Sequence, residues 1–256
     1  MRRTTASLLL ASGLLALALV LVLLRFAAVT DYLYHGLVKD PDRVPPAGPL
    51  VVAPADGRVL YVRRVERGEI PEVVKRGVAV PLARHLRLEG EADFAPGWLV
   101  GIYMNTDGVH VNRSPVAGTL EERTVWNGPH LEMSAVERTV ILTQLLPGWV
   151  SLKKLLGVPP YDIEDDADFV LQSARETLRI RDERASDVYL VRIADFTVGK
   201  ILTWAAPGDP LALGQRIGMI TWGSQTDVFF ADTGTTRVVV AVGDYVYGGE
   251  TVLAVH

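Results

Sequence analysis

Three residues in separate parts of the chain, Asp56, His110 and Ser224, carry the side chains needed for serine-based acyl chemistry. Serine becomes a nucleophile when a base takes its proton, histidine is the usual base, and a carboxylate can orient the imidazole ring. The chain contains no cysteine, so thiol nucleophiles, disulfides and thiolate metal sites are excluded. Taken singly, Asp56 is typical of a turn and His110 of a half-buried strand residue.

The Gly223–Ser224 pair ends an apolar stretch, residues 217–222, that is typical of a strand. Glycine adopts backbone conformations closed to other residues, so the serine hydroxyl could attack its own Gly223–Ser224 peptide bond. The alternative is an ordinary Gly-Ser turn that closes a hairpin. If the bond is cleaved, we expect the strands on its two sides to hold both fragments together in one sheet.

The N-terminal region predicts a membrane anchor. Residues 7–24 are uncharged and consist mostly of Leu, Ala and Val, which as a helix would be about 27 Å long, close to the thickness of the bilayer's hydrocarbon core. A cleaved signal peptide is the alternative, although the apolar run is long for one. We therefore divide the chain into an anchor over 1–30, a proline-rich linker over 31–49 and a main domain over 50–256.

From residue 50 onward the pattern is mostly that of β-strands, and two weak internal repeats occur. Pro-Ala-Asp-Gly at 54–57 is echoed by Pro-Val-Ala-Gly at 115–118, and the Gly-Asp run at 208–214 by the one at 243–249. Paired turn-and-strand copies favour a mostly β (α+β) fold, a pseudo-symmetric sandwich with lipoyl-like hairpins. The weakest pattern lies at 130–184, where only 149–156 reads as an amphipathic stretch.

Taken together and in their order along the chain, the turn, histidine and Gly-Ser motifs resemble those of the phosphatidylserine decarboxylase family, and in particular of its short, archaetidylserine-decarboxylase-like branch. The chain departs from that pattern at Trp222, where the family usually has Phe, and at Gln225, where it commonly has Arg or Thr. Asp107 stands where the long bacterial branch has a second histidine, and Gly108 where the short branch commonly has Asp. The matching stretches are the apolar N-terminus and residues 39–43, 52–59, 109–118, 182–184 and 208–228.

The resemblance implies a self-processing carboxy-lyase that converts phosphatidylserine, or a related serine phospholipid, to the ethanolamine lipid. His110, oriented by Asp56, would take the proton of Ser224, whose oxygen attacks the Gly223 carbonyl. Elimination and hydrolysis would leave one chain ending at Gly223 and a shorter one beginning with a pyruvoyl group made from Ser224. This covalent pyruvoyl group is the only cofactor implied, no metal is implied, and it would serve as the electron sink for decarboxylation. His110 is the first candidate for the later proton donor.

The partners implied are the aminophospholipid, the membrane and the protein's own two cleaved chains, with a homodimer left open. The net charge of -4, without a long basic run, argues against a nucleic-acid partner. Arg2 and Arg3 favour a cytoplasmic N-terminus while Arg25 and Lys39 favour the opposite. We expect the inner membrane, with the catalytic part at its cytoplasmic face.

Two other functions stay open on the residues alone. The first is a non-catalytic, membrane-anchored lipoyl-like β module that binds partners, although no hairpin tip offers an obvious lysine for attachment of a lipoyl or biotinyl group. The second is a serine hydrolase that uses Asp56, His110 and Ser224, although the chain lacks Gly-x-Ser-x-Gly around Ser224. Neither predicts cleavage of the chain.

Overall fold

The computed structural model describes residues 12–27, 39–70, 80–88, 94–104, 108–129, 148–158, 172–194, 200–221 and 224–256. Within these ranges the domain that follows the linker is mostly β, as the sequence predicts. Its two labelled helices are α2 (Leu82–Leu86) and α4 (Trp149–Leu155). The strands are β1 (Leu50–Val52), β2 (Gly57–Val65), β3 (Glu69–Ile70), β4 (Val80–Pro81), β5 (Gly97–Met104), β6 (Val111–Arg113), β7 (Gly118–Trp126), β8 (Arg175–Asp182), β9 (Asp187–Ala194), β10 (Ile201–Thr203), β11 (Pro210–Leu211), β12 (Arg216–Ile220), β13 (Ser224–Ala231), β14 (Arg237–Val238), β15 (Tyr245–Val246) and β16 (Val252–Val255).

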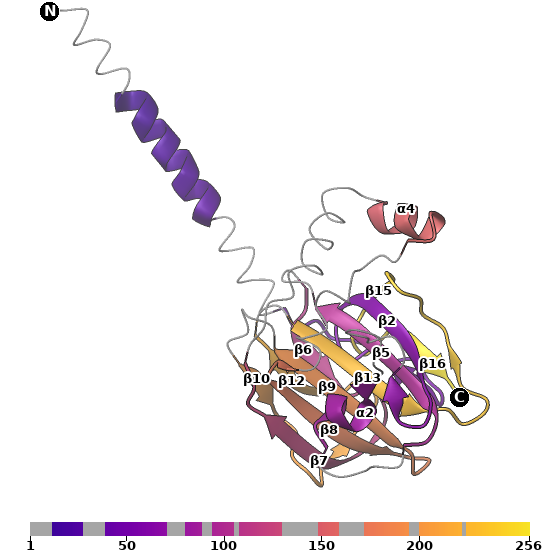
Figure 1. Cartoon of the computed structure of the whole chain (residues 1–256). Coiled ribbons are helices and arrows are strands. Elements are labelled where there is room, and N and C mark those ends of the chain that lie inside the picture. Colours follow the sequence, from indigo (N-terminus) through magenta and orange to yellow (C-terminus); the bar gives the residue numbers. More distant parts are fainter. Residues whose placement is uncertain are drawn as a thin grey trace, which may run out of the picture.

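An eight-stranded antiparallel sheet forms the centre of this domain, in the order β11-β7-β8-β9-β13-β5-β2-β15 (Figure 1). Two three-stranded sheets, β1-β16-β14 and β10-β12-β6, and the β3-β4 pair complete the strand arrangement. β13 lies in the interior of the large sheet and pairs along its length with both β5 and β9. Its first residue, Ser224, is therefore held from both sides by neighbouring backbone.

The strand pairing is internally repeated. β15 pairs with the first residues of β2, and β11 pairs in the same way with the first residues of β7. β1 pairs with β16 as β6 pairs with β12, and the two sets of strands meet where β9 pairs with β13. The repeated turns at 54–57 and 115–118 thus occupy equivalent places, directly before β2 and β7.

Side chains of β13 alternate between two faces of the sheet, as in any strand. Val228 and Phe230 pack in one apolar cluster with residues of β5 and β2, whereas Phe229 packs in another cluster that includes Leu82 and Leu86 of α2. By the same alternation Ser224 lies on the face of Val228, opposite to α2. The face covered by α2 is called the α2 face below.

α2 is fixed to the sheet by a buried polar contact as well as by its leucines. Nε2 of His85 lies 2.7 Å from Oδ2 of Asp227, and neither side chain is exposed. The Tyr61 hydroxyl donates a hydrogen bond of 2.7 Å to the same carboxylate oxygen. Burial, and secondarily the Asp227 charge, raise the pKa of Tyr61 well above its usual value, so this phenol stays a donor.

Residues 12–27 form an exposed helix, drawn in indigo in Figure 1. The remainder of the predicted anchor, residues 1–11 and 28–30, lies outside the described residues. In the part of the chain that the structure describes, no helix combines the length and apolarity needed to cross a membrane. The stretch predicted to be amphipathic contains the helix α4, in which Val150 is buried whereas Leu155 is 83% exposed.

Candidate active site

Ser224 is fully buried at the start of β13, in register with Met104 of β5 and Ala194 of β9. Its hydroxyl donates to the sulfur of Met104 at 3.2 Å. A thioether is a weak acceptor, so little interaction energy opposes rotation of the hydroxyl toward a stronger base. Apolar side chains of Met104, Ala194 and Ile220 form a small cluster around this point. The serine hydroxyl is therefore shielded from water but only loosely held, although the backbone of Ser224 is paired on both sides.

The bond before Ser224 connects two different sheets. β12 ends at Ile220 and belongs to the three-stranded sheet with β10 and β6, whereas β13 belongs to the eight-stranded sheet. The expectation that one sheet holds both sides of the bond is therefore wrong. The physical reason is that β12 pairs with β10 and β6, whereas β13 pairs with β5 and β9. Gly223, the other half of the predicted cleavage site, lies outside the described residues, as does Trp222.

His110 comes directly before β6 and is fully buried, not half-buried as expected. Its Nδ1 lies 2.8 Å from the carbonyl oxygen of Gly108. A carbonyl can only accept, so Nδ1 carries the proton and Nε2 is the basic nitrogen of the neutral ring. The His110 carbonyl accepts from the Ile220 N–H at 3.1 Å, which pairs His110 with the end of the strand leading toward Ser224.

Asp56 is buried in the turn between β1 and β2, but its partners differ from those expected. Its carboxylate accepts hydrogen bonds from Nη2 of Arg43 at 2.9 Å and from the Gly248 N–H at 2.8 Å. Among the described residues it makes no hydrogen bond to His110. Burial raises the pKa of Asp56, and the Gly248 N–H and the Arg43 charge oppose that rise. The role of Asp56 in orienting His110 stays a prediction.

The motif at 39–43 ties the linker to the main domain. The Asp40 carboxylate accepts from Arg216 at 2.7 Å and from Arg113 at 3.3 Å, and Asp42 accepts from Arg216 at 2.8 Å. Arg43 binds Glu250 as well as Asp56. Since Arg216 lies on β12 and Arg113 on β6, these contacts fix the same small sheet that leads to Ser224.

A buried polar network near Ser224 was not singled out in the sequence. Asn112 donates to the Met104 sulfur at 3.6 Å and accepts from Arg192 of β9 at 3.4 Å. Arg192 is in turn paired with Glu176 of β8. Burial, and secondarily repulsion from Arg123, lower the pKa of Arg192 to about 9. In the sequence these residues stand as polar positions that alternate with apolar ones in strands. Recognising that they form one network requires knowledge of which strands pair.

A cavity of about 200 Å³ lies on the Ser224 side of the sheet. Ala194, the residue opposite Ser224 in the register, forms part of its wall. Lys200 gives the cavity positive charge, whereas Arg123 is ion-paired with Glu176 of the same lining. The backbone of Lys200 is bonded to Thr221 at 2.8 and 3.0 Å. The full lining comprises Arg123, Val125, Trp126, Asn127, Ala174, Arg175, Glu176, Ala194, Lys200 and Ile201. The site thus combines a shielded hydroxyl, a buried imidazole and a basic cavity.

Comparison with known proteins agrees with this arrangement. The family model of phosphatidylserine decarboxylase matches residues 36–254, which includes Asp56, His110 and Ser224. The chain belongs to the phosphatidylserine decarboxylase family. It is 32% identical over 217 residues to the phosphatidylserine decarboxylase proenzyme of Nitrosomonas europaea, covering 84% of this chain and 74% of that protein. It is 33% identical over 219 residues to the proenzyme of the same name from Symbiobacterium thermophilum, covering 84% and 75%. The resemblance drawn from the motifs is confirmed.

Proposed function

We infer that this chain is a self-processing decarboxylase, a carboxy-lyase that converts phosphatidylserine to the ethanolamine lipid. The observation that carries the inference is the position of Ser224. It follows a glycine, opens a central strand, and lies inside the stretch matched by the phosphatidylserine decarboxylase family. The relatives named as proenzymes support a processed form. We further propose that the paired turns before β2 and β7 correspond to lipoyl-like hairpins.

Processing begins, in this proposal, with transfer of the Ser224 proton to Nε2 of His110. The serine oxygen then forms a bond to the carbonyl carbon of Gly223, and the peptide C–N bond breaks to leave an ester and a free amine on residue 224. Elimination releases the Gly223 carboxylate, and hydrolysis of the resulting enamine, through its imine tautomer, consumes one water and releases ammonia. A buried hydroxyl with only a thioether acceptor is suited to the first step, because no strong hydrogen bond must be broken.

The surroundings of Ser224 fit a small ketone-bearing group at the same position. Met104, Ala194 and Ile220 enclose it without an amine or thiol that would react with a ketone. When formed, a pyruvoyl group supplies the electron sink for loss of the carboxylate. The chain's own residues bind and orient the substrate: Lys200 offers charge to the lipid phosphate, and the apolar wall excludes water from the reacting carbon. His110 is the group we assign to return a proton.

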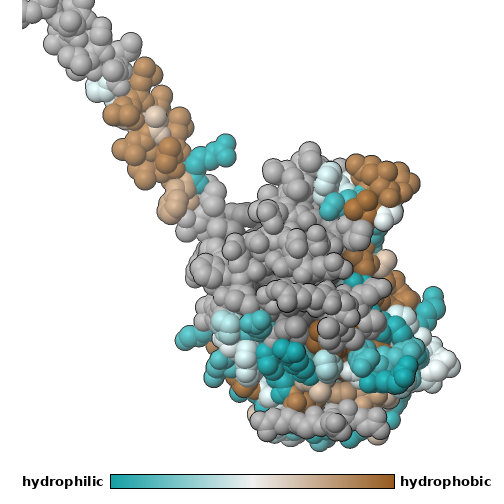
Figure 2. Space-filling view, viewed as in Figure 1, coloured by the Kyte–Doolittle hydropathy of each residue, from teal (hydrophilic) through white to brown (hydrophobic). Residues whose placement is uncertain are grey.

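Membrane association is part of the proposal. The helix of residues 12–27 exposes a continuous apolar surface, seen in brown in Figure 2. Leu152, Leu155 and Leu156, in or next to α4, are also exposed, at 47%, 83% and 66%. Both features would favour contact with a lipid surface. We propose an inner-membrane location with the catalytic part at the cytoplasmic face, where the substrate lipid would be within reach.

Purified full-length protein tests the proposed function directly. Denaturing electrophoresis and intact mass measurement should reveal a fragment covering 224–256 whose first residue is a ketone rather than serine. The same preparation should release carbon dioxide from phosphatidylserine. Ser224→Ala should give one unbroken chain and no activity, because the nucleophile is lost. An unbroken wild-type chain that still decarboxylated the lipid would overturn the processing mechanism.

A further inference from the structure

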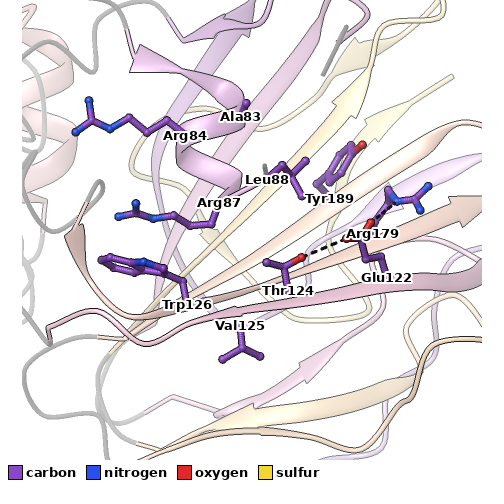
Figure 3. Close-up of a pocket in the computed structure, with 10 residues that line it drawn as sticks. All are labelled: Ala83, Arg84, Arg87, Leu88, Glu122, Thr124, Val125, Trp126, Arg179 and Tyr189. Atoms are coloured by element: carbon purple, nitrogen blue, oxygen red, sulfur yellow. Dashed lines mark hydrogen bonds and ion pairs between the residues drawn. The ribbon is translucent and has the colours of Figure 1, made fainter. Parts of the chain in front are cut away.

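A second, larger hollow lies on the α2 face of the sheet, away from Ser224. It has a volume of about 680 Å³ and is bounded by α2 above and by β7, β8 and β9 below (Figure 3). Tyr189 in its wall belongs to the same apolar cluster as Phe229 and the leucines of α2, which assigns the hollow to that face. The side chain of Ser224 lies on the other face, so the proposed decarboxylation leaves this cavity without a role.

Positive charge is concentrated at one end of this cavity. Arg84 and Arg87, three residues apart, extend from α2 toward the side where Trp126 lies (Figure 3). The Arg87 guanidinium is 3.5 Å from the centre of the Trp126 ring, a stacked geometry that holds the side chain in one orientation. The side chain of Arg84 makes no hydrogen bond or ion pair among the described residues. Arg179, by contrast, is paired with Glu122 in the cavity wall.

The two α2 arginines repel one another across the mouth of the cavity. Burial lowers the pKa of Arg87, and repulsion from Arg84 lowers it further. An anion between the two guanidinium groups would offset that repulsion. Planar guanidinium forks match the oxygens of a phosphate group particularly well.

The backbone at Arg87 provides an independent observation. Arg87 ends α2 in the left-handed region, at φ 55° and ψ 37°, where glycine is the usual residue because a Cβ is unfavourable there. A left-handed residue is common at the C-terminal end of a helix, and here it sets the direction in which the Arg87 side chain leaves α2. Here the strained residue is the one whose side chain is stacked on Trp126 at the cavity.

We propose that this cavity is a binding site for a phosphate carried by an amphiphilic molecule. Arg84 and Arg87 hold the phosphate, and Trp126, Leu88 and Tyr189 contact the apolar portion next to it. The size of the cavity suits a ligand larger than a bare phosphate ion, since sites of roughly 300–1,000 Å³ are typical for small organic ligands. A phospholipid head group and a free phosphate share the required anion, and only the former uses the apolar wall.

The test is equilibrium binding to the full-length chain by calorimetry, with two probes. One is dihexanoyl phosphatidylglycerol below its micellar concentration, which carries no serine to react at position 224, and the other is inorganic phosphate. We expect saturable binding of the lipid and binding of inorganic phosphate at least about tenfold weaker. Quenching of tryptophan fluorescence by the lipid should decrease in Trp126→Phe. Because Trp126 also lines the cavity beside Ser224, the site is located by Arg84 and Arg87, which of these two cavities line only the one on the α2 face.

Two substitutions and a matched control separate binding from folding. Arg84→Gln and Arg87→Gly should each weaken lipid binding at least about tenfold, although glycine relieves the strained backbone at position 87. Arg67→Gly is the control, because Arg67 is an exposed arginine that also has positive φ, 53°, outside the cavity. It should bind like wild type, and circular dichroism should show the same fold in all variants.

Wild-type affinity in both Arg84→Gln and Arg87→Gly would overturn the site. Equal affinity for inorganic phosphate and the lipid would overturn its assignment to an amphiphile. Because the readout is binding of a lipid that lacks serine, either failure is distinct from a failure of the decarboxylase function.

Discussion

The Arg43 guanidinium donates a hydrogen bond of 2.9 Å to the Asp56 carboxylate, and both side chains are less than a tenth exposed. Gly248 N–H binds the other carboxylate oxygen. Asp56 therefore joins three segments that are distant in sequence: the linker, the turn before β2 and the turn after β15. This gives it a structural role that exists whether or not it also orients His110.

The first prediction follows from the burial of Asp56. Because burial raises the folded-state pKa above the ordinary 3.8, the folded protein binds the proton more tightly than the unfolded chain. As the pH rises from about 3.8 through the raised pKa, Asp56 ionises and its contribution to the free energy of unfolding is progressively lost. Asp56→Asn, which cannot ionise, should lack this decline. Removing the cation in Arg43→Gln should steepen it, since Arg43 lowers the Asp56 pKa.

Urea unfolding over a pH series measures this, with Ser224→Ala as the common background so that every variant is a single chain. Each unit of difference between the two pKa values corresponds to about 1.4 kcal/mol of unfolding free energy. Parallel pH profiles for the background protein and for its Asp56→Asn variant would show that the carboxyl titrates normally despite its burial.

The second prediction concerns the base. His110→Ala and His110→Gln should both remain uncleaved, because neither can take the Ser224 proton. Glutamine is the informative variant, since its amide can still donate to the Gly108 carbonyl and preserve that structural contact. Denaturing electrophoresis after prolonged incubation gives the answer. Cleavage of His110→Gln at the wild-type rate would reduce His110 to a structural residue.

Much of the sheet could be predicted because its strands have an apolar pattern. The stretches at 50–53, 58–62 and 98–104 lie within or overlap β1, β2 and β5. β8 was not predicted, since Arg175, Glu176 and other charged residues alternate along it. Arg175 and Glu176 are nevertheless buried, and they are satisfied by an ion pair across strands and by carbonyls such as that of His85. Local composition cannot reveal such partners.

The site could be predicted only in part, because local pattern does not reveal contacts between residues that are distant in sequence. The local pattern placed Ser224 at the end of the strand-like stretch 217–222 and His110 within a strand, whereas Ser224 begins β13 and His110 directly precedes β6. The pairing of Asp56 with Arg43 does not follow from local pattern, because it depends on where the linker lies against the domain. α2 was also missed: with residues Leu82–Leu86 it is too short for a helical period to be recognised, and its position is fixed by His85 and Asp227.

The third prediction addresses the cavity beside Ser224. Lys200→Ala should raise the KM for phosphatidylserine about tenfold with a smaller change in kcat, because a contact to the lipid phosphate stabilises substrate and transition state alike. Lys153→Ala is the matched control, since Lys153 lies on α4 and does not line this cavity. Assays on short-chain lipid remove effects of membrane binding. A loss confined to kcat would indicate a role at the reacting atoms instead.

The last prediction concerns the fate of the C-terminal fragment after cleavage. β13 pairs with β5 along its whole length and with β9 from Ser224 to Phe230, and β15 and β16 pair with β2 and β1 of the longer fragment. Apolar residues of β13, such as Val228 and Phe230, are also fully or almost fully buried. The two fragments should therefore stay associated although the bond connects two sheets rather than one.

Size-exclusion chromatography under native conditions should give one peak that contains both fragments, and only denaturation should separate them. The uncleaved Ser224→Ala protein provides the elution volume of the intact chain. Because the backbone pairing of β13 does not require the Gly223–Ser224 bond, cleaved and uncleaved forms should elute together. A native peak lacking the fragment 224–256 would mean that the strand contacts do not suffice to hold it, and that processing releases the strand carrying the reactive group.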